Sequence, residues 1–439
     1  MAPIIDVHAH IFNAMDIPVD GYLQSRRSER KGSTIEYFVN FFPGPQIYTY
    51  LAERMRERCV TRKLGVGETG WIYRQLLKLF GMATKEKLKD WEESLTKDVE
   101  TIASDLVHTW EDIDLYVPLM IDYEYWFKNT LDNKLEDQIK LVRQIVRAHQ
   151  GRIHPFVPFD PARELVYQVG MNNPDGQLEK YGSLNMVKHA IEEGGFIGVK
   201  LYNSLGYRPS NNKKVEDHRM LMAIRNEKMQ YLFGGEEYDR VLSDLYRYCE
   251  ENEVPITTHC GMYGIESYPD ASFDFGKAIY WEDVLSQYQG LRLNLAHFGW
   301  NQRVRYGGEK NWVKDICRMM TRFDHLYTDV SCHRVTTAQD RQGYISEYKK
   351  IIRDFPIIKN RLLFGTDWHV LKRVKNYRKF KDGYLEVLKH KGLFTKSEID
   401  DFLGGNAMNF LGLRRGDRNW QRLKTLYAKK GITPPAWFP

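Results

Sequence analysis

The 439-residue sequence has no long hydrophobic run and few cysteines. No apolar run approaches the roughly 18 residues that a membrane-spanning helix needs, so we expect no membrane span. The five cysteines are scattered and form no Cys-x-x-Cys pair, which argues against a disulfide framework and favours a reducing cytoplasm. No charged and apolar leader precedes the first apolar strand, so export is not expected.

Strong charge of one sign is also lacking. The formal net charge of +6 comes from 64 basic and 58 acidic residues, a small excess over a large surface, so the sequence does not predict nucleic-acid binding. We find no Ser-His-Asp order, no phosphate-binding loop of the Walker type and no Rossmann glycine pattern. The 42% hydrophobic and 28% charged residues that are present are typical of a soluble globular protein with an ample core.

Short runs of apolar and β-branched residues recur along the chain, each followed by a helical pattern. These runs predict eight strands: Ile4 to His10, Ile113 to Ile121, Ile153 to Phe159, Phe196 to Tyr202, Val254 to His259, Leu291 to His297, Leu326 to Ser331 and Leu362 to Thr366. Eight strands alternating with helices favour a parallel sheet that closes into a (β/α)8 barrel. A doubly wound open sheet is the alternative, but it gives no reason for histidines at the ends of distant strands.

The uneven spacing of the strands predicts two insertions in one barrel that spans residues 1–413. The first, over 34–100, has a mostly helical pattern and follows the first strand; the second, over 204–235, is polar and follows the fourth. The second is interpreted equally well as a lid or as a solvated loop. A basic tail with interspersed aromatic residues, 414–439, is expected to pack on the barrel or on a partner subunit.

The first strand carries the first chemical signal, because it ends in His8-Ala9-His10. Side chains at i and i+2 of a strand point to the same face, so both imidazoles can reach one point in space. On its own the pair is more often structural than metal-binding.

Other strands also end in polar residues. Lys200 ends the fourth strand, His259 the fifth and His297 the sixth, and Asp367 follows the eighth. The carboxyl ends of all strands meet at one mouth of a parallel barrel, so these residues should converge with His8 and His10 on one pocket. Chance placement of so many on separate strand ends is far less probable than a functional site.

At this point the chain resembles the amidohydrolase superfamily, in particular its amidohydrolase 2 branch of metal-dependent TIM-barrel hydrolases and related decarboxylases. The resemblance covers the barrel but not 34–100 or the tail. It rests on Asp6-Val7-His8-Ala9-His10, the strand at 195–201, Thr258-His259, Ala296-His297-Phe298-Gly299, Gly365-Thr366-Asp367-Trp368 and Gly405-Asn406-Ala407.

The resemblance implies that one divalent metal is bound by His8, His10, His259 and Asp367, with His297 as an acid/base beside it and Asp367 also as a proton acceptor. Three imidazoles and a carboxylate suit Zn²⁺ best, with Mn²⁺, Fe²⁺ or Co²⁺ as alternatives. The implied activity is hydrolysis of a C–N or C–O bond by attack of activated water on a carbonyl carbon. Non-oxidative decarboxylation of an aromatic or unsaturated acid uses the same ligand set and is the alternative. A non-catalytic barrel with a structural metal fits an open mouth poorly.

The lysine on the fourth strand leaves one choice open. In some amidohydrolases it is carboxylated and bridges two metals, whereas in this branch it more often stays cationic, either neutralising Asp6 or meeting an anionic substrate. We predict a small-molecule substrate that carries a carboxylate or carbonyl, and the resemblance implies a homodimer. The residues predicted to touch substrate are Lys200, Arg303, Arg334, His333, Trp368 and His369, with Arg305 as a further candidate beside Arg303.

Overall fold

The structure is a computed structural model that describes residues 2–18, 95–127, 131, 133–172, 181–215, 233–262, 264–267, 270–299 and 312–439. Each of the eight predicted strand regions contains a strand, usually shorter than predicted. The strands are β1 (Ile5–Ala9), β2 (Leu115–Pro118), β3 (Phe156–Pro158), β4 (Gly198–Leu201), β5 (Ile256–Thr258), β6 (Leu293–Leu295), β7 (Leu326–Asp329) and β8 (Leu362–Leu363).

The strands form a closed barrel. Strand β1 pairs in parallel with β2, and β3 to β8 form a parallel sheet in sequential order. A bridge between Leu119 and Phe156 joins β2 to β3, and the amide of Val7 donates to the carbonyl of Phe364 at 3.0 Å, which joins β8 to β1. These contacts close the ring and confirm the predicted (β/α)8 fold, so the open-sheet alternative is wrong.

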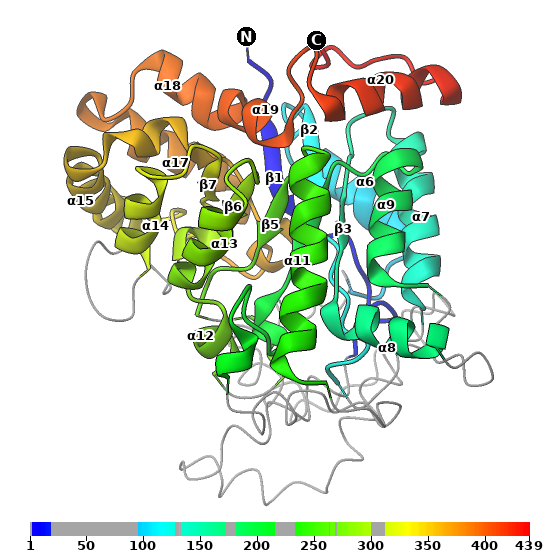
Figure 1. Cartoon of the computed structure of the whole chain (residues 1–439). Helices are drawn as coiled ribbons and strands as arrows, with labels where there is room; N and C mark the ends of the chain where they lie inside the picture. Colours follow the sequence, from blue (N-terminus) through cyan, green and yellow to red (C-terminus); the bar gives the residue numbers. More distant parts are fainter. Residues whose placement is uncertain are drawn as a thin grey trace, which may run out of the picture.

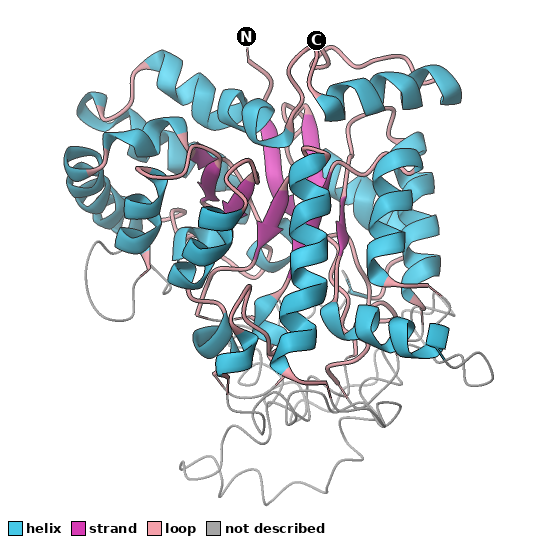
Figure 2. Ribbon diagram, in the orientation of Figure 1, coloured by secondary structure: helices cyan, strands magenta, loops and turns pink. Residues whose placement is uncertain are grey.

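Helices surround the strands (Figure 2). In chain order they are α6 (Val99–Thr109), α7 (Leu135–Ala148), α8 (Pro161–Asn172), α9 (Ser183–Glu193), α11 (Gly235–Glu251), α12 (Ala271–Phe275), α13 (Glu282–Gln287), α14 (Val313–Met320), α15 (Ala338–Asp354), α16 (Trp368–Leu371), α17 (Phe380–Lys389), α18 (Lys396–Asp400), α19 (Asn406–Leu411) and α20 (Arg418–Lys430).

Helix α7 illustrates why these segments fold as they do. Its buried apolar residues recur at three- and four-residue spacing, so one face meets the strands while charged residues cover the other. Helix α6 begins at an N-cap, Asp98, whose side chain accepts a hydrogen bond from the amide of Thr101. The same periodicity places the remaining barrel helices against the sheet.

The tail packs on the amino-terminal end of the barrel. Figure 1 shows α20 near the two chain termini, above the strands. Tyr427 and Trp437 are buried in one apolar cluster with Ile5, Val7 and Leu115 from β1 and β2. The indole of Trp437 donates to the carbonyl of Gly151 at 3.1 Å. The tail therefore packs on the barrel, which is one of the two surfaces expected for it.

Most of the predicted first insertion lies outside the described residues, which resume at residue 95. Of the second insertion, 204–215 and 233–235 are described, and α11 begins at Gly235. The boundaries of both insertions stay predictions. Among the described residues, no helix combines the length and apolar character that crossing a membrane requires.

Candidate metal centre

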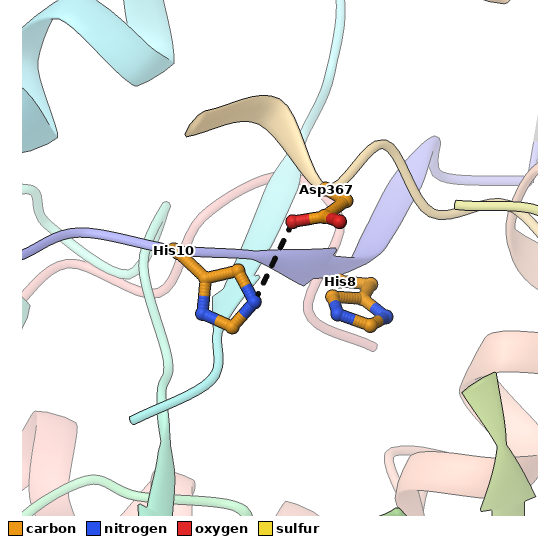
Figure 3. Close-up of side chains that lie close together, drawn as sticks. All are labelled: His8, His10 and Asp367. Carbon is orange, nitrogen blue, oxygen red and sulfur yellow. Dashed lines mark ion pairs between the residues drawn. The ribbon is translucent and has the colours of Figure 1, made fainter. Parts of the chain in front are cut away.

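Two histidines and an aspartate meet at the carboxyl end of the barrel (Figure 3). His8 and His10 lie at the end of β1, and the carbonyl of His8 accepts hydrogen bonds from the amides of Thr366 and Asp367, at 3.2 and 2.6 Å. These hydrogen bonds hold the segment that follows β8 against the end of β1. One side-chain donor atom from each of His8, His10 and Asp367 lies within 4.8 Å of the other two, and all three residues are buried.

The pair formed by His10 and Asp367 offers two acceptor atoms to a cation. His10 Nδ1 lies 2.7 Å from the carbonyl of Leu119 and must donate to it, so Nε2 presents its lone pair to Asp367 Oδ1, 3.5 Å away. Burial lowers the pKa of His10 well below its usual value, which keeps the ring neutral. Asp367 Oδ1 is itself buried and has no hydrogen-bond partner among the described residues. Two buried acceptors facing each other fit a divalent metal between them.

His8 is oriented from its other side. Its Nδ1 lies 3.1 Å from Asp329 Oδ2 and 3.0 Å from the Ser331 hydroxyl, both from the end of β7. Because the carboxylate can only accept, Nδ1 carries the proton and Nε2 is the nitrogen that can bind a metal. The three donors thus offer two imidazole nitrogens and one carboxylate oxygen.

His297 and His259 contact each other rather than this group. His297 Nε2 lies 3.1 Å from His259 Nδ1, and the two rings meet edge to face. The ring of His259 also packs on Tyr202, with centroids 4.9 Å apart. The structure brings His297 within 4.8 Å of donor atoms of His8 and Asp329 but does not place His259 in either cluster. Metal binding by His259 stays a prediction.

Several strand ends adopt the left-handed conformation that side chains rarely accept. His297 and Phe298 have φ of 63° and 52° after β6, Cys332 has 61° after β7 and Asp367 has 53° after β8. Such a conformation costs about 1–3 kcal/mol and persists where surrounding contacts enforce it. His297 and Asp367 are therefore both held in constrained turns directly after their strands.

Lys200 points into the barrel without a hydrogen-bonding partner. Its ammonium is buried, is not hydrogen-bonded to any described residue and lies 5.7 Å from the centre of the Tyr202 ring. Burial lowers its pKa to about 8, opposed by the negative charges of Asp329 and Asp367. The suggested pairing with Asp6 does not appear, since that carboxylate accepts from the amide and hydroxyl of Thr366, at 2.9 and 2.6 Å.

The other predicted substrate residues differ in their surroundings. His369 is buried against Phe12, with ring centroids 4.6 Å apart, and neither ring nitrogen is hydrogen-bonded in the described part of the chain. In contrast, His333 Nδ1 contacts the Tyr384 hydroxyl, and Nε2 lies 3.0 Å from the carbonyl of His297. Both nitrogens of His333 are therefore engaged inside the protein, which leaves its predicted contact with substrate without support from this geometry.

Trp368 and Arg334 complete that set. The Trp368 indole donates to the Thr109 hydroxyl at 2.9 Å and is buried, whereas Arg334 is exposed. Arg303 and Arg305 lie outside the described residues. Substrate binding by all of these residues stays a prediction.

Sequence reasoning missed Asp329. It ends β7 as the other polar residues end their strands, and Thr328-Asp329-Val330-Ser331 carried the same signal. The sequence did not show that a side chain from β7 can contact a ligand on β1. Strand β7 lies next to β8, and the Asp329 carboxylate reaches past the end of β8 to His8.

Comparison with known proteins identifies the class. The family model described as Amidohydrolase matches residues 180–413, more than half of the chain. This match and the barrel define an enzyme of the amidohydrolase type. The chain belongs to the amidohydrolase family. No curated protein matches it.

Three solved structures illustrate the similarity to known proteins. An uncharacterised TIM-barrel protein from Bordetella bronchiseptica is 16% identical over 98% of this chain and 99% of its own, with a TM-score of 0.44. A zinc-bound amidohydrolase from Burkholderia multivorans is 12% identical over 73% and 91%, with a TM-score of 0.41. A dihydroxybenzoic acid decarboxylase from Polaromonas, with bound manganese and 2-nitroresorcinol, is 12% identical over 78% and 94%, with a TM-score of 0.43.

Proposed function

We propose that the chain is a metal-dependent hydrolase that cleaves a C–N or C–O bond next to a carbonyl. The observation that carries the proposal is Asp367 Oδ1, which is buried 3.5 Å from His10 Nε2 and has no hydrogen-bond partner in the part of the chain that the structure describes. His8, His10 and Asp367 would hold the metal, with His259 as a fourth ligand, and Zn²⁺ is the ion that this set suits best. When bound, such an ion lowers the pKa of water toward neutrality and polarises a carbonyl oxygen.

The protein side chains would then handle protons. Asp367 would help to hold the metal, and its carboxylate would accept the proton of the attacking water. His297 Nδ1 lies 2.8 Å from the Ser331 hydroxyl, which fixes the ring, and Nε2 would exchange a proton with the substrate oxygen or leaving group once it gives up its contact with His259 Nδ1. The buried site excludes bulk water and strengthens these interactions.

A buried cation supports an anionic substrate. Lys200 is charged below pH 8 and lacks a hydrogen-bonding partner among the described residues, so a substrate carboxylate would satisfy it. His369, two residues after Asp367, has neither ring nitrogen hydrogen-bonded among the described residues and would offer a second hydrogen-bonding group to the substrate. We therefore propose a small carboxylate-bearing substrate.

The test is a metal-reconstitution assay that follows two products at once. Metal-free protein is loaded separately with Zn²⁺, Mn²⁺, Fe²⁺ or Co²⁺ and offered carboxylate-bearing lactones, esters and amides, together with aromatic carboxylic acids. We expect hydrolysis that requires metal and is lost in Asp367→Ala. Release of CO₂ without hydrolysis would favour the decarboxylase alternative, and metal-independent turnover would contradict both.

A non-catalytic role is tested with the same preparations. If the metal-loaded protein turned over none of these compounds and His297→Ala left ligand binding unchanged, the metal would be structural. We expect instead that His297→Ala lowers kcat while metal content stays at the wild-type level.

A further inference from the structure

Asp329 is a fully buried carboxylate at the carboxyl end of β7. It reaches His8 across the end of β8, where the chain has Gly365. A Cβ atom on Gly365 would lie 2.9 Å from His8 Cβ and 3.5 Å from Asp329 Cγ. Any larger residue there would crowd the imidazole from its backbone side. The glycine therefore allows the close approach of Asp329 and His8.

The hydrogen bonds of Asp329 divide between its two oxygens. Oδ2 accepts from His8 Nδ1 at 3.1 Å and from Asn294 Nδ2 at 2.8 Å. Oδ1 accepts from the backbone amides of His297 at 3.1 Å and Ser331 at 3.0 Å, and from the Ser331 hydroxyl. Five donors on two oxygens use the full acceptor capacity of a carboxylate.

This saturation bears on the second group of possible ligands, His8, His297 and Asp329. Oxygens that already accept five hydrogen bonds have no lone pair left for an ion. His8 Nδ1 is likewise occupied as a donor, so its metal-binding nitrogen is Nε2. The group is better explained as the support of a single metal centre than as a second one.

We infer that Asp329 is a positioning residue that fixes His8 for metal binding and anchors the turn at His297. This inference rests on the proposed metal site. Through Oδ2 it sets the tautomer and the rotation of the His8 ring. Through Oδ1 it holds the backbone of His297, which has φ of 63° and needs such an anchor. Carboxylates behind metal-binding histidines raise metal affinity in this way.

Asparagine at position 329 distinguishes hydrogen bonding by the carboxylate from its steric contribution to packing. Asp329→Asn keeps the shape but replaces one acceptor oxygen by an amino group. Either orientation of the amide then directs its N–H groups at donors, at the two on the His8 side or at the three on the His297 side. The matched control is Asp160→Asn, because Asp160 is also a buried strand-end carboxylate and accepts from Trp126 Nε1 at 2.5 Å and the Arg163 amide at 2.8 Å.

The experiment titrates metal-free wild-type, Asp329→Asn and Asp160→Asn protein with Co²⁺. The readouts are the dissociation constant and the visible absorption spectrum of bound Co²⁺. We expect Asp329→Asn to bind about 10–100-fold more weakly and with an altered spectrum. Asp160→Asn should bind like the wild type, whatever its thermal stability, because it does not contact the ligands.

Wild-type affinity and an unchanged spectrum in Asp329→Asn would overturn the inference while leaving the metal site intact. Wild-type protein that binds no Co²⁺ would contradict the metal site itself. If Asp329→Asn does not fold, Asn294→Ala is the second variant, since it removes one donor to Oδ2 without touching a ligand. It should weaken binding by about tenfold, as loss of one hydrogen bond to a charged group predicts, and an unchanged dissociation constant would also overturn the role of Asp329.

Discussion

The two ends of the barrel use the same residue types differently. At the amino-terminal end, His154 is buried with both ring nitrogens hydrogen-bonded, to the Gly195 carbonyl at 2.8 Å and the Tyr427 hydroxyl at 2.7 Å. At the carboxyl end, His369 is equally buried but has neither nitrogen hydrogen-bonded within the described residues, and the same is true of the ammonium of Lys200. The hydrogen bonds of His154 help to hold the tail on the barrel, whereas His369 and Lys200 have hydrogen-bonding groups that a ligand could use.

The largest expected effect is loss of the metal by a change at the carboxyl end. Asp367→Ala removes the only carboxylate of the three-residue cluster, so we expect metal affinity to fall by more than about 100-fold, beyond the effect of an outer partner. Metal analysis after dialysis and kcat/KM measure it. His154→Gln is the control at the opposite end and should retain metal. Equal metal loss in both variants would break the comparison between the two ends.

A change at the amino-terminal end should affect stability instead. Trp437→Ala leaves a cavity in the apolar cluster at the amino-terminal end of the barrel, so the free energy of unfolding should fall by about 3–5 kcal/mol. Denaturant unfolding measures this loss. Metal affinity of the folded variant should equal that of the wild type. A weakened metal site would show that the two ends are coupled.

Lys200→Met tests the unsatisfied cation, and its effect depends on pH. The pKa of Lys200 is about 8 in the folded protein, below the ordinary value of 10.5, because the ammonium is buried. Between pH 8 and 10.5 the unfolded chain therefore binds more protons than the folded protein, so the free energy of unfolding increases as the pH rises through this window. Below pH 8 the folded protein bears the whole free-energy cost of burying the charged ammonium. Lys200→Met should remove that rise and, at pH 7, stabilise the protein by about 1–3 kcal/mol.

The same variant should weaken catalysis on carboxylate substrates. In the wild type, kcat/KM for such a substrate should fall as the pH rises through about 8, since the cation is lost. Lys200→Met should show a low and flat profile over this range. Comparison with a neutral substrate is the control, and equal losses for both substrates would argue against charge recognition.

The smallest expected effect is at Arg334, which is exposed at the rim. Arg334→Met should raise KM for acidic substrates by a few-fold, about 1 kcal/mol or less, because solvent screens an exposed charge. KM for neutral substrates should stay unchanged. Equal shifts for both would remove Arg334 from the predicted set of substrate-binding residues.

The sequence predicted the strands and the first ligands because both depend on local patterns. Short runs of apolar and β-branched residues marked each strand, and the His-x-His spacing brought two imidazoles to one face of β1. Closure of the barrel then placed Asp367 beside them. These relations follow from strand order alone.

What the sequence did not predict depends on packing across strands. The contact of Asp329 with His8 requires Gly365, just after β8, between them, and the engagement of His333 by Tyr384 depends on helix α17. Whether a buried histidine is satisfied, like His154, or unsatisfied, like His369, is likewise decided by partners far apart in the chain.

The most direct test of the account is anomalous diffraction from crystals of Zn²⁺-loaded protein. We predict one peak per chain, at about 2.0–2.2 Å from His8 Nε2, His10 Nε2 and a carboxylate oxygen of Asp367. A second peak beside a carboxylated Lys200 would contradict the single-metal site. No peak within reach of His10 and Asp367 would contradict the metal centre altogether.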